Sequence, residues 1–371
     1  MLKRFEAIVV VVFQLFIISI IVTCCSENEC TPDCSSKECG DDGCGGLCVP
    51  GCDSDETCNE DTGQCDPNEI YCSDIGEIIQ LGTYDLPDYA YDIEVVGEQA
   101  YIADAEGGLQ IVNISDPTNP TFTSELFGGF GALGIDVQGS YAYIAYADDG
   151  LYVVDIGDPS APERIGYGPS AGWRFHDVSI VDDTAYVAWD YHDGGGGMVI
   201  YDVSDPSRPV RKGYCETGQL AVGITIDDRF AYIANLTLGV YTIELLKPEI
   251  PLGSYDTPGQ AYAIAIEGNY GYIADGQSGL QIIDISNRRY PSFVAELDLQ
   301  DNVVNVMIVE QYAYMTGTEK FHIVDVHDPS NPIFVKSYDQ FTGSIGGLDV
   351  RGNLAYLGGD SLHVVKVCDL P

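Results

Sequence analysis

Residues 89–120 read YAYDIEVVGEQAYIADAEGGLQIVNISDPTNP, and this phrase returns along the chain. Residues 131–162 read GALGIDVQGSYAYIAYADDGLYVVDIGDPSAP, and residues 260–291 read QAYAIAIEGNYGYIADGQSGLQIIDISNRRYP. The tyrosine of the AYIA-like core recurs at intervals of 40 to 46 residues, as Tyr101, Tyr143, Tyr186, Tyr232, Tyr272, Tyr314 and Tyr356. This period is typical of β-propellers, in which each repeat forms one four-stranded blade. The sequence therefore predicts an all-β fold with seven blades.

The strands of a blade can be identified from short β-branched and aromatic runs separated by turns. In the first unit these runs are YDIEVV, QAYIAD, LQIVNI and TFTSEL, which we expect to form strands A, B, C and D. In the SDPTNP turn, Asp accepts backbone N–H bonds and Pro presets φ. We therefore expect the equivalent aspartates to shape turns rather than to bind ligands: Asp116, Asp158, Asp205 and Asp328.

The two ends of the repeat region indicate how the ring closes. The seventh unit ends after its strand C, and a segment that resembles strand D, EIIQLGTYDLP at 77–87, precedes the first strand A. We expect this segment to complete the last blade, because closure removes exposed sheet edges. The same alignment places Cys72 near Cys368 and predicts a disulfide between them. Cys215 has no comparable partner, and we expect it to be a buried thiol.

Units of the form GLQIIDISDPxxP preceded by AYIADG resemble the LVIVD repeat family of bacterial and archaeal surface propellers, over residues 77–371. The resemblance implies the propeller fold and an exported protein, and it implies no single activity. Two units depart from the pattern. LLKPEIP at 245–251 replaces the usual turn in the fourth unit, and the seventh unit has no such turn.

The N-terminal part of the chain has a different composition, with 11 of the 13 cysteines between Cys24 and Cys72. MLKR followed by an apolar run at 7–22 has the layout of a secretory signal sequence, which we place at residues 1–24. The run ends in IVTCCS, which resembles a bacterial lipobox with Cys24 or Cys25 as the lipidated residue. An ordinary cleaved signal and an uncleaved membrane anchor are the alternatives. We expect a lipid-anchored protein at the bacterial outer membrane or cell surface.

Residues 25–72 predict a small disulfide-rich spacer, followed by the propeller at 73–371. Eight cysteines lie between Cys30 and Cys65 among very few large apolar residues, so this segment needs cross-links to be stable. A zinc cluster is the weaker alternative, because the segment has no C-x2-C pair and no histidine. CGDDGCGG at 39–46 resembles a Cys-rich module of deltaproteobacterial lipoproteins.

The charge balance limits the partners. Sixteen Lys and Arg against 58 Asp and Glu give a formal net charge of −42, which repels nucleic acid and anionic lipid. Contact with a membrane is therefore expected through the lipid anchor only. Because stacked blades cover both faces of every sheet, we expect a monomer. We expect its partner to be a surface protein or a glycan.

The first candidate site lies in the third unit, where the loop between strands B and C is longer than in the other units. The third unit brings to one face of the propeller the side chains Trp173, His176, Trp189, Asp190, Tyr191, His192 and Asp193. Tryptophans beside acids can stack on a sugar or enclose a cation, and two histidines with an aspartate can bind a metal. The alternative is that these aromatic residues pack on the neighbouring blade.

The second candidate site is the wall of the central channel. The inner strands place polar residues there, with Asp92, Glu94, Asp136, Asp177 and Asp349 as possible metal ligands beside Ser179 and Asn305. Neighbouring carboxylates raise one another's pKa unless a cation neutralises them, and calcium is the cation that an exported, oxygen-rich site selects. The alternative is a solvated tunnel without a bound ion.

No GxSxG, HExxH or glycine-rich nucleotide motif is present in the sequence. The expected function is therefore a non-catalytic, cell-surface lipoprotein whose propeller presents a binding face to a protein, a glycan or a cation. A calcium-dependent hydrolase or lyase that uses the acidic channel, with His176 or His192 as base, is one alternative. A purely structural envelope protein is the other.

Overall fold

The computed structural model describes residues 75–129, 131–191, 194–341 and 345–368, together with the backbone of short strands between Cys25 and Pro67. The chain divides into two compact units, Met1–Tyr71 and Cys72–Pro371. In the first unit, β1 (Cys25–Ser26) pairs with β2 (Glu29–Cys30), β3 (Gly40–Asp41) with β4 (Leu47–Cys48), and β5 (Glu56–Cys58) with β6 (Cys65–Pro67). The predicted signal sequence, Cys24 and Cys72 lie outside the described residues.

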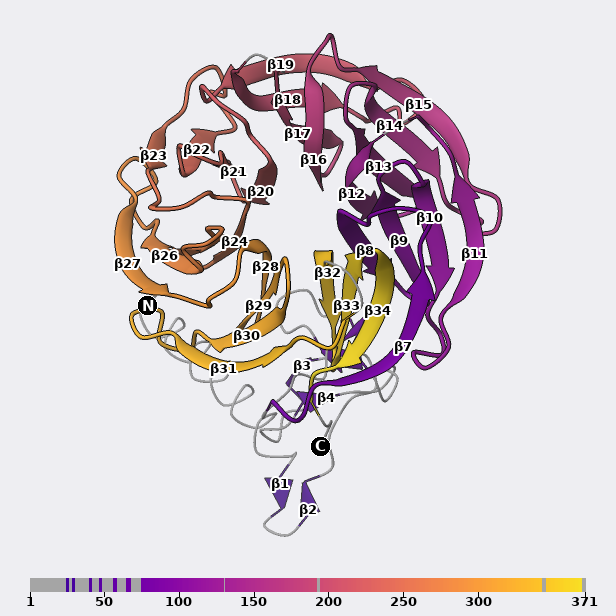
Figure 1. The fold of residues 1–371 in the computed structure, drawn as a ribbon, viewed down its shortest axis with the longest axis vertical. Helices are drawn as coiled ribbons and strands as arrows, with labels where there is room; N and C mark the ends of the chain where they lie inside the picture. The colour runs from indigo at the N-terminus through magenta and orange to yellow at the C-terminus, as the bar shows by residue number, and fades with distance from the viewer. Residues whose placement is uncertain are drawn as a thin grey trace, which may run out of the picture. The chain divides into compact units, whose positions relative to one another are not determined.

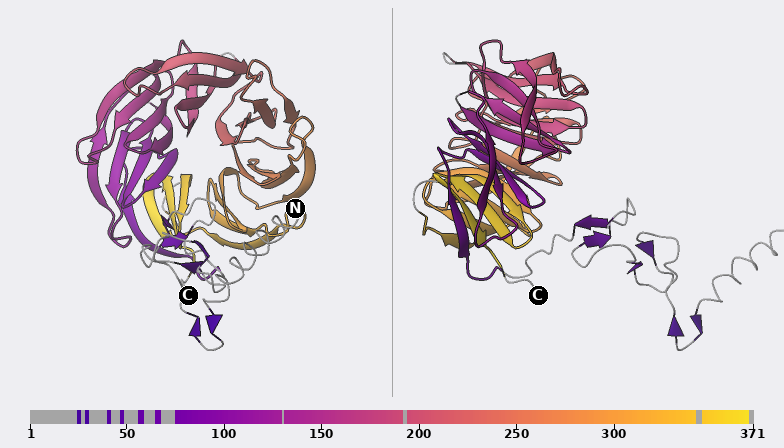
Figure 2. Two further views of the ribbon diagram at one scale, coloured as in Figure 1. Left: turned by 180° about the vertical axis from the view of Figure 1, so that it is seen from behind. Right: turned by 90° about the vertical axis from the view of Figure 1, so that its right-hand side faces the viewer.

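The described part of the second unit consists of seven antiparallel four-stranded sheets around a central opening (Figure 1). The left view of Figure 2 shows the same ring from behind. In chain order the first three blades are β8 (Asp92–Val96), β9 (Gln99–Asp104), β10 (Gly108–Asn113) and β11 (Thr121–Leu126); β12 (Ala132–Gln138), β13 (Tyr141–Tyr146), β14 (Gly150–Asp155) and β15 (Glu163–Pro169); and β16 (Arg174–Val181), β17 (Thr184–Asp190), β18 (Gly196–Asp202) and β19 (Val210–Glu216).

The remaining blades repeat the order from the inner to the outer strand. They are β20 (Gly223–Asp227), β21 (Phe230–Ala234), β22 (Val240–Glu244) and β23 (Gly253–Tyr255); β24 (Ala263–Glu267), β25 (Tyr270–Ala274), β26 (Leu280–Asp284) and β27 (Ser292–Leu297); β28 (Val303–Val309), β29 (Tyr312–Gly317), β30 (Phe321–Asp325) and β31 (Ile333–Tyr338); and β32 (Ile345–Arg351), β33 (Leu354–Gly359), β34 (Ser361–Lys366) and β7 (Ile79–Asp85). The predicted seven-bladed, all-β fold is confirmed. The described residues contain no helix that is long and apolar enough to cross a membrane.

The ring closes through the last blade, as the sequence predicts. β7 pairs antiparallel with β34, from Ser361 opposite Asp85 to Lys366 opposite Ile79. Figure 1 shows this contact as an indigo strand on the outer side of the yellow blade. Cys368, directly after β34, is buried and held in a disulfide. Its predicted partner Cys72 is outside the described residues, so that pairing stays a prediction.

Apolar clusters between neighbouring blades form the core. One of them joins Ile111 of the first blade to Ile135 and Ile144 of the second. The repeated tyrosines lie on the second strand of each blade, and most are buried, with Tyr232 and Tyr272 almost fully so. Burial raises the pKa of both of these phenols to about 12. The repeat tyrosine is therefore a packing residue.

The turn aspartates act as the sequence predicts. Asp116 accepts hydrogen bonds from the backbone N–H and the hydroxyl of Thr118. Asp158, Asp205 and Asp328 accept the same pair from the serine two residues on. In the fifth blade, Asn287 takes this place and accepts from the N–H of Arg289. Because the groups that donate to these side-chain oxygens lie only two residues further along the chain, these side chains form turns between the third and fourth strands.

Candidate functional site

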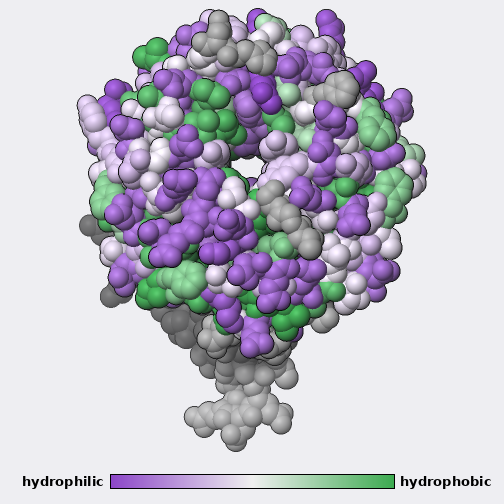
Figure 3. Space-filling model, viewed as in Figure 1, coloured by the Kyte–Doolittle hydropathy of each residue, from purple (hydrophilic) through white to green (hydrophobic). Residues whose placement is uncertain are grey.

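The inner strands surround a channel, which is visible as the opening at the centre of Figure 3. Strands alternate their side chains between two faces, so every second residue of these strands reaches the channel wall. A cavity of about 290 Å³ lies inside, and all five predicted metal ligands line it: Asp92, Glu94, Asp136, Asp177 and Asp349. Ser179 and Asn305 line it too, as predicted. All predicted residues of the second candidate site therefore line the same cavity.

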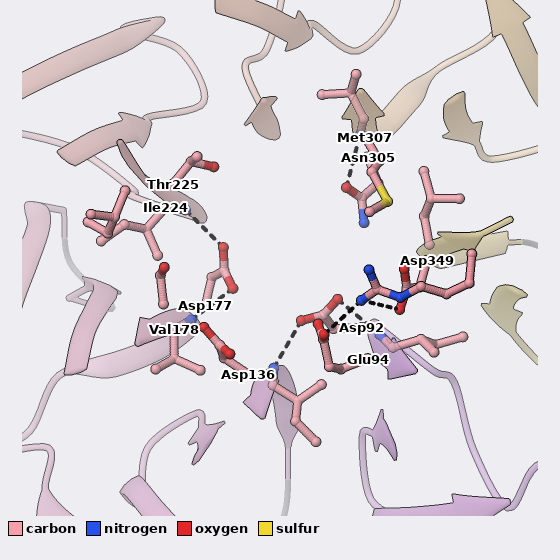
Figure 4. A pocket seen from close by; sticks show the side chains of 17 residues that line it. Asp92, Glu94, Asp136, Asp177, Val178, Ile224, Thr225, Asn305, Met307 and Asp349 are labelled. Atoms are coloured by element: carbon pink, nitrogen blue, oxygen red, sulfur yellow. Dashed lines mark hydrogen bonds and ion pairs between the residues drawn. The ribbon is translucent and has the colours of Figure 1, made fainter. Parts of the chain in front are cut away.

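The carboxylates occupy only part of the wall. They come from β32, β8, β12 and β16, which are the inner strands of the seventh, first, second and third blades. The wall opposite presents Thr225, Asn305 and Met307, from the fourth and sixth blades (Figure 4). The channel thus has an acidic side and a neutral side.

The acidic residues also form two layers. Glu94, Asp136 and Asp349 each lie opposite the repeat tyrosine of the neighbouring strand. Asp92 and Asp177 lie opposite Ala103 and Ala188, two residues further along. Two residues of a strand span roughly 6.6 Å, so the two layers are about that far apart along the strands.

Four of these carboxylates connect one blade to the next. Asp92 Oδ2 accepts a hydrogen bond from the N–H of Ile135 at 2.9 Å, and Asp177 Oδ2 accepts one from Ile224 at 2.8 Å. Asp136 Oδ2 accepts from Ile180 and Asp349 Oδ2 from Val95, each at 2.7 Å. Each of these four bonds crosses to the following blade. Sequence analysis missed this role, although the recurrence of aspartate at two alternating inner positions was a usable signal.

Arg351 is the cation among the residues that line this cavity. Its guanidinium lies 3.0 Å from Glu94 Oε1 and 3.1 Å from Asp349 Oδ2. Burial raises the pKa of Glu94 to about 8; Asp349 adds to this shift and Arg351 opposes it. Burial also raises the pKa of Asp177 to about 7, and the pKa values of Asp92, Asp136 and Asp349 are raised for the same reason.

The acidic side chains are spread along the wall rather than gathered at a point. Within the described residues, no group of three or more His, Cys, Asp or Glu side chains is arranged to hold a metal ion. Calcium takes six to eight oxygen ligands, so an ion here would need many water or backbone oxygens. The predicted calcium site stays a prediction.

The mouth of the channel forms a second cavity of about 400 Å³, which shares the lining residues Asp92, Asp177 and Asn305 with the first. Its wall includes the rings of Tyr89, Tyr91 and Tyr262 and the side chains of Arg174 and His176. Tyr91 is 49% exposed and lies edge-on to Tyr89, with the ring centroids 4.9 Å apart. The mouth therefore offers aromatic faces above an acidic interior.

The LVIVD repeat model matches residues 87–126, 131–167, 175–217, 258–298 and 302–340, which together make up more than half of the chain. The chain belongs to the LVIVD repeat family. The LVIVD matches omit the fourth and seventh units, where the sequence departs from the pattern.

Two solved structures resemble this LVIVD-repeat propeller. The β-propeller domain of Cps50 (Swd1) from Myceliophteria thermophila matches with a TM-score of 0.64 and 10% identity, over 78% of this chain and 100% of that one. The computationally designed Ika8 protein matches with a TM-score of 0.56 and 10% identity, over 75% of this chain and 83% of that one. At such identity the likeness concerns the fold alone. No curated protein matches the chain.

In the third LVIVD repeat, the structure corrects the expectation that Trp173 and Trp189 form a binding face. Trp173 and Trp189 are only 5% and 1% exposed, and their rings stack 4.3 Å apart at 16°. The Arg211 guanidinium lies 5.2 Å from the Trp173 ring on the outer side. Neither indole presents an open face to a sugar, because the neighbouring side chains cover both rings. The tryptophans are core residues, as in the packing alternative.

The other members of that candidate set separate. His176 Nε2 lies 3.1 Å from Asp190 Oδ1, and His176 lines the channel mouth while Asp190 is buried behind it. Tyr191 is 39% exposed and lies edge-on to Trp189. His192 and Asp193 fall outside the described residues. Of the members of this set that the structure describes, only His176 lines the channel mouth.

Proposed function

We propose that this LVIVD-repeat protein is a non-catalytic binding protein, displayed on a bacterial cell surface through a lipid on Cys24 or Cys25, and that its ligand binds at the channel mouth. The mouth cavity of about 400 Å³ carries the proposal. Three tyrosines, an arginine and a histidine line it together with two aspartates, so aromatic, cationic and anionic groups meet in one concave place. Concave sites with a few polar groups are where ligands bind most often.

The charge of the molecule supports display at a distance from the membrane. A net charge of −42 repels anionic lipid head groups, so the lipid anchor would hold the protein to the membrane while the propeller stays free of its surface. The predicted Cys-rich spacer would then separate the two. A ligand with cationic groups would be attracted to the propeller, because long-range attraction speeds encounter.

The display part of the proposal is tested in cells with Cys24→Ala, Cys25→Ala and the double variant. Metabolic labelling with a fatty-acid analogue should mark the wild-type protein and be lost in one single variant and in the double variant. Externally added protease should digest the propeller epitope on intact cells. Labelling that persists in the double variant, or an epitope that external protease cannot reach, would contradict this part.

The binding part is tested with the full-length protein on arrays of glycans and extracellular proteins. Tyr91→Ala and Tyr262→Ala remove aromatic faces from the mouth. Each variant should lower the affinity for a bound partner by tenfold or more. Tyr290→Ala is the matched control, because Tyr290 is 71% exposed and does not line either cavity. Equal losses in all three variants, or no partner at all, would argue against the mouth as a binding site.

A further inference from the structure

We propose that the acidic side of the channel binds an alkyl diamine, a short methylene chain with an ammonium group at each end. This inference rests on the proposed function and deepens it, because it names the class of ligand that enters through the mouth. Four features of the channel carry it: unbalanced charge, an unpaired buried oxygen, the two acidic layers and the neutral opposite wall.

The first feature is the lack of counter-charge. Arg351 is already shared between Glu94 and Asp349. None of the ion pairs in the described part of the chain involves Asp92, Asp136 or Asp177, although all three line the same cavity. Buried carboxylates without a cation are costly, so the channel favours entry of positive charge.

The second feature is an unsatisfied acceptor. Among the residues that the structure describes, none donates a hydrogen bond to Asp349 Oδ1, although the side chain is only 3% exposed and lines the cavity. An unpaired buried polar atom costs about 1–3 kcal/mol, which a donor from a ligand would recover. Because an ionised carboxylate oxygen accepts and does not donate, a ligand would pair with it through a donor such as an ammonium group.

The third feature is the spacing of the charges. The layer of Glu94, Asp136 and Asp349 and the layer of Asp92 and Asp177 are separated by about 6.6 Å along the strands. One compact metal ion reaches a single layer. A diamine with four or five methylene groups is long enough to place one ammonium group in each layer, so it matches this arrangement better.

The fourth feature is the opposite wall. Met307 of β28 lies on the neutral wall, across the channel from the acidic side (Figure 4). Its thioether side chain is flexible and offers an adaptable apolar surface to a methylene chain. At the mouth, the tyrosine rings provide faces that attract an ammonium group during entry. The channel therefore matches both the charged ends and the apolar middle of a diamine.

The direct test is calorimetric titration of the full-length protein with 1,5-diaminopentane at about pH 8.5, which is above the pKa of about 8 of Glu94 and the pKa of about 7 of Asp177. We expect saturable binding that weakens as salt is added. Pentan-1-ol, which has the chain without the charge, should give no heat. Calcium chloride is the third titrant. Saturable heat from calcium alone, with none from the diamine, would overturn the inference.

Variants locate the binding. Asp349→Asn keeps an oxygen for the Val95 N–H and removes the charge, and it should weaken diamine binding at least tenfold. Glu94→Gln is the second variant, in case Asp349→Asn folds poorly. Glu163→Gln is the control, because Glu163 is exposed on the outermost strand of the second blade. If the control weakens binding as much as the channel variants do, attraction to overall charge explains the binding and the inference fails.

The two proposals fail separately. If no diamine binds while a surface partner is still lost on Tyr91→Ala, the ligand class is wrong and the binding mouth remains. If diamines bind in the channel but the lipid label and external protease give negative results, surface display is wrong and the ligand class remains.

Discussion

Asp349 of the last blade accepts a hydrogen bond at 2.7 Å from the backbone N–H of Val95 in the first blade. This bond crosses the place where the ring closes, and the contact of Arg351 with Glu94 crosses it beside the bond. Together with the pairing of β7 and β34, these contacts join the two ends of the repeat array. The closing contact is thus made of charged and polar groups on the channel side and of a β-ladder on the outside.

Replacing Asp349 should weaken this closure. Asp349→Ala leaves the Val95 N–H without its acceptor and removes one carboxylate from Arg351, so we expect a loss of about 1–3 kcal/mol in unfolding free energy. Urea unfolding followed by tryptophan fluorescence measures this loss. Asp349→Asn should lose less because it keeps the acceptor, and equal losses in both variants would show that the charge rather than the hydrogen bond matters.

Stability should fall as pH rises through neutrality. The pKa of Glu94 is about 8 in the folded protein, well above its ordinary value of about 4.3 in an unfolded chain. Between these values the folded state binds more protons than the unfolded state. The resulting contribution to the free energy of unfolding is therefore present at low pH and is lost as pH approaches about 8. The pKa of Asp177, about 7, acts in the same direction.

Melting temperatures from about pH 5 to about pH 9 test this dependence. Glu94→Gln cannot ionise, so its melting temperature should fall less steeply over that range than that of the wild type. Glu163→Gln controls for a change of one charge on the surface. A Glu94→Gln slope as steep as that of the wild type would show that Glu94 is ionised across the whole range.

Trp189 should be needed for stability rather than for recognition. It is 1% exposed and stacks on Trp173, so Trp189→Ala should cost about 3–5 kcal/mol of unfolding free energy. Chemical denaturation followed by circular dichroism measures this loss. Any ligand of the mouth should bind the folded fraction of this variant with wild-type affinity. A large drop in that affinity would show that Trp189 takes part in binding.

Cys215 should be unreactive in the folded protein. It is a free, buried thiol, and burial raises its pKa to about 11, so the reactive thiolate is scarce at neutral pH. A thiol-specific chromogenic reagent should label it only after denaturation, with Cys215→Ser as the control. Rapid labelling of the native protein would mean that the blade containing Cys215 opens frequently.

The fold could be read from the sequence because the repeat is local. The spacing of Tyr101 and its equivalents and the SDPxxP turns carry their structural meaning within one unit. Segment 77–87 could be assigned to the last blade because it supplies the fourth strand that the seventh unit lacks. The alternation of side chains along the inner strands also predicts that Asp92 and Asp136 lie on the channel wall, where the structure has them.

The partners of those residues could not be predicted in the same way. The bond from Ile135 to Asp92 and the stack of Trp173 on Trp189 depend on how one blade sits against the next or how a loop folds back. Such contacts join residues from different strands, and no periodicity within one strand encodes them. For this reason the tryptophans looked like a surface site in the sequence and are core residues in the structure.

The pairing of β7 with β34 also has a kinetic consequence. Asp85 and Ser361, which interact through their side chains in this blade, are 276 residues apart in the chain. β7 is synthesised before every other propeller strand and must wait for its partner until the last blade has formed. Contacts between such distant residues form slowly, and an unpaired strand is prone to associate with other chains. The concluding step of folding is therefore the one most exposed to misassembly, and a factor that shields β7 during that interval would raise the yield of closed rings.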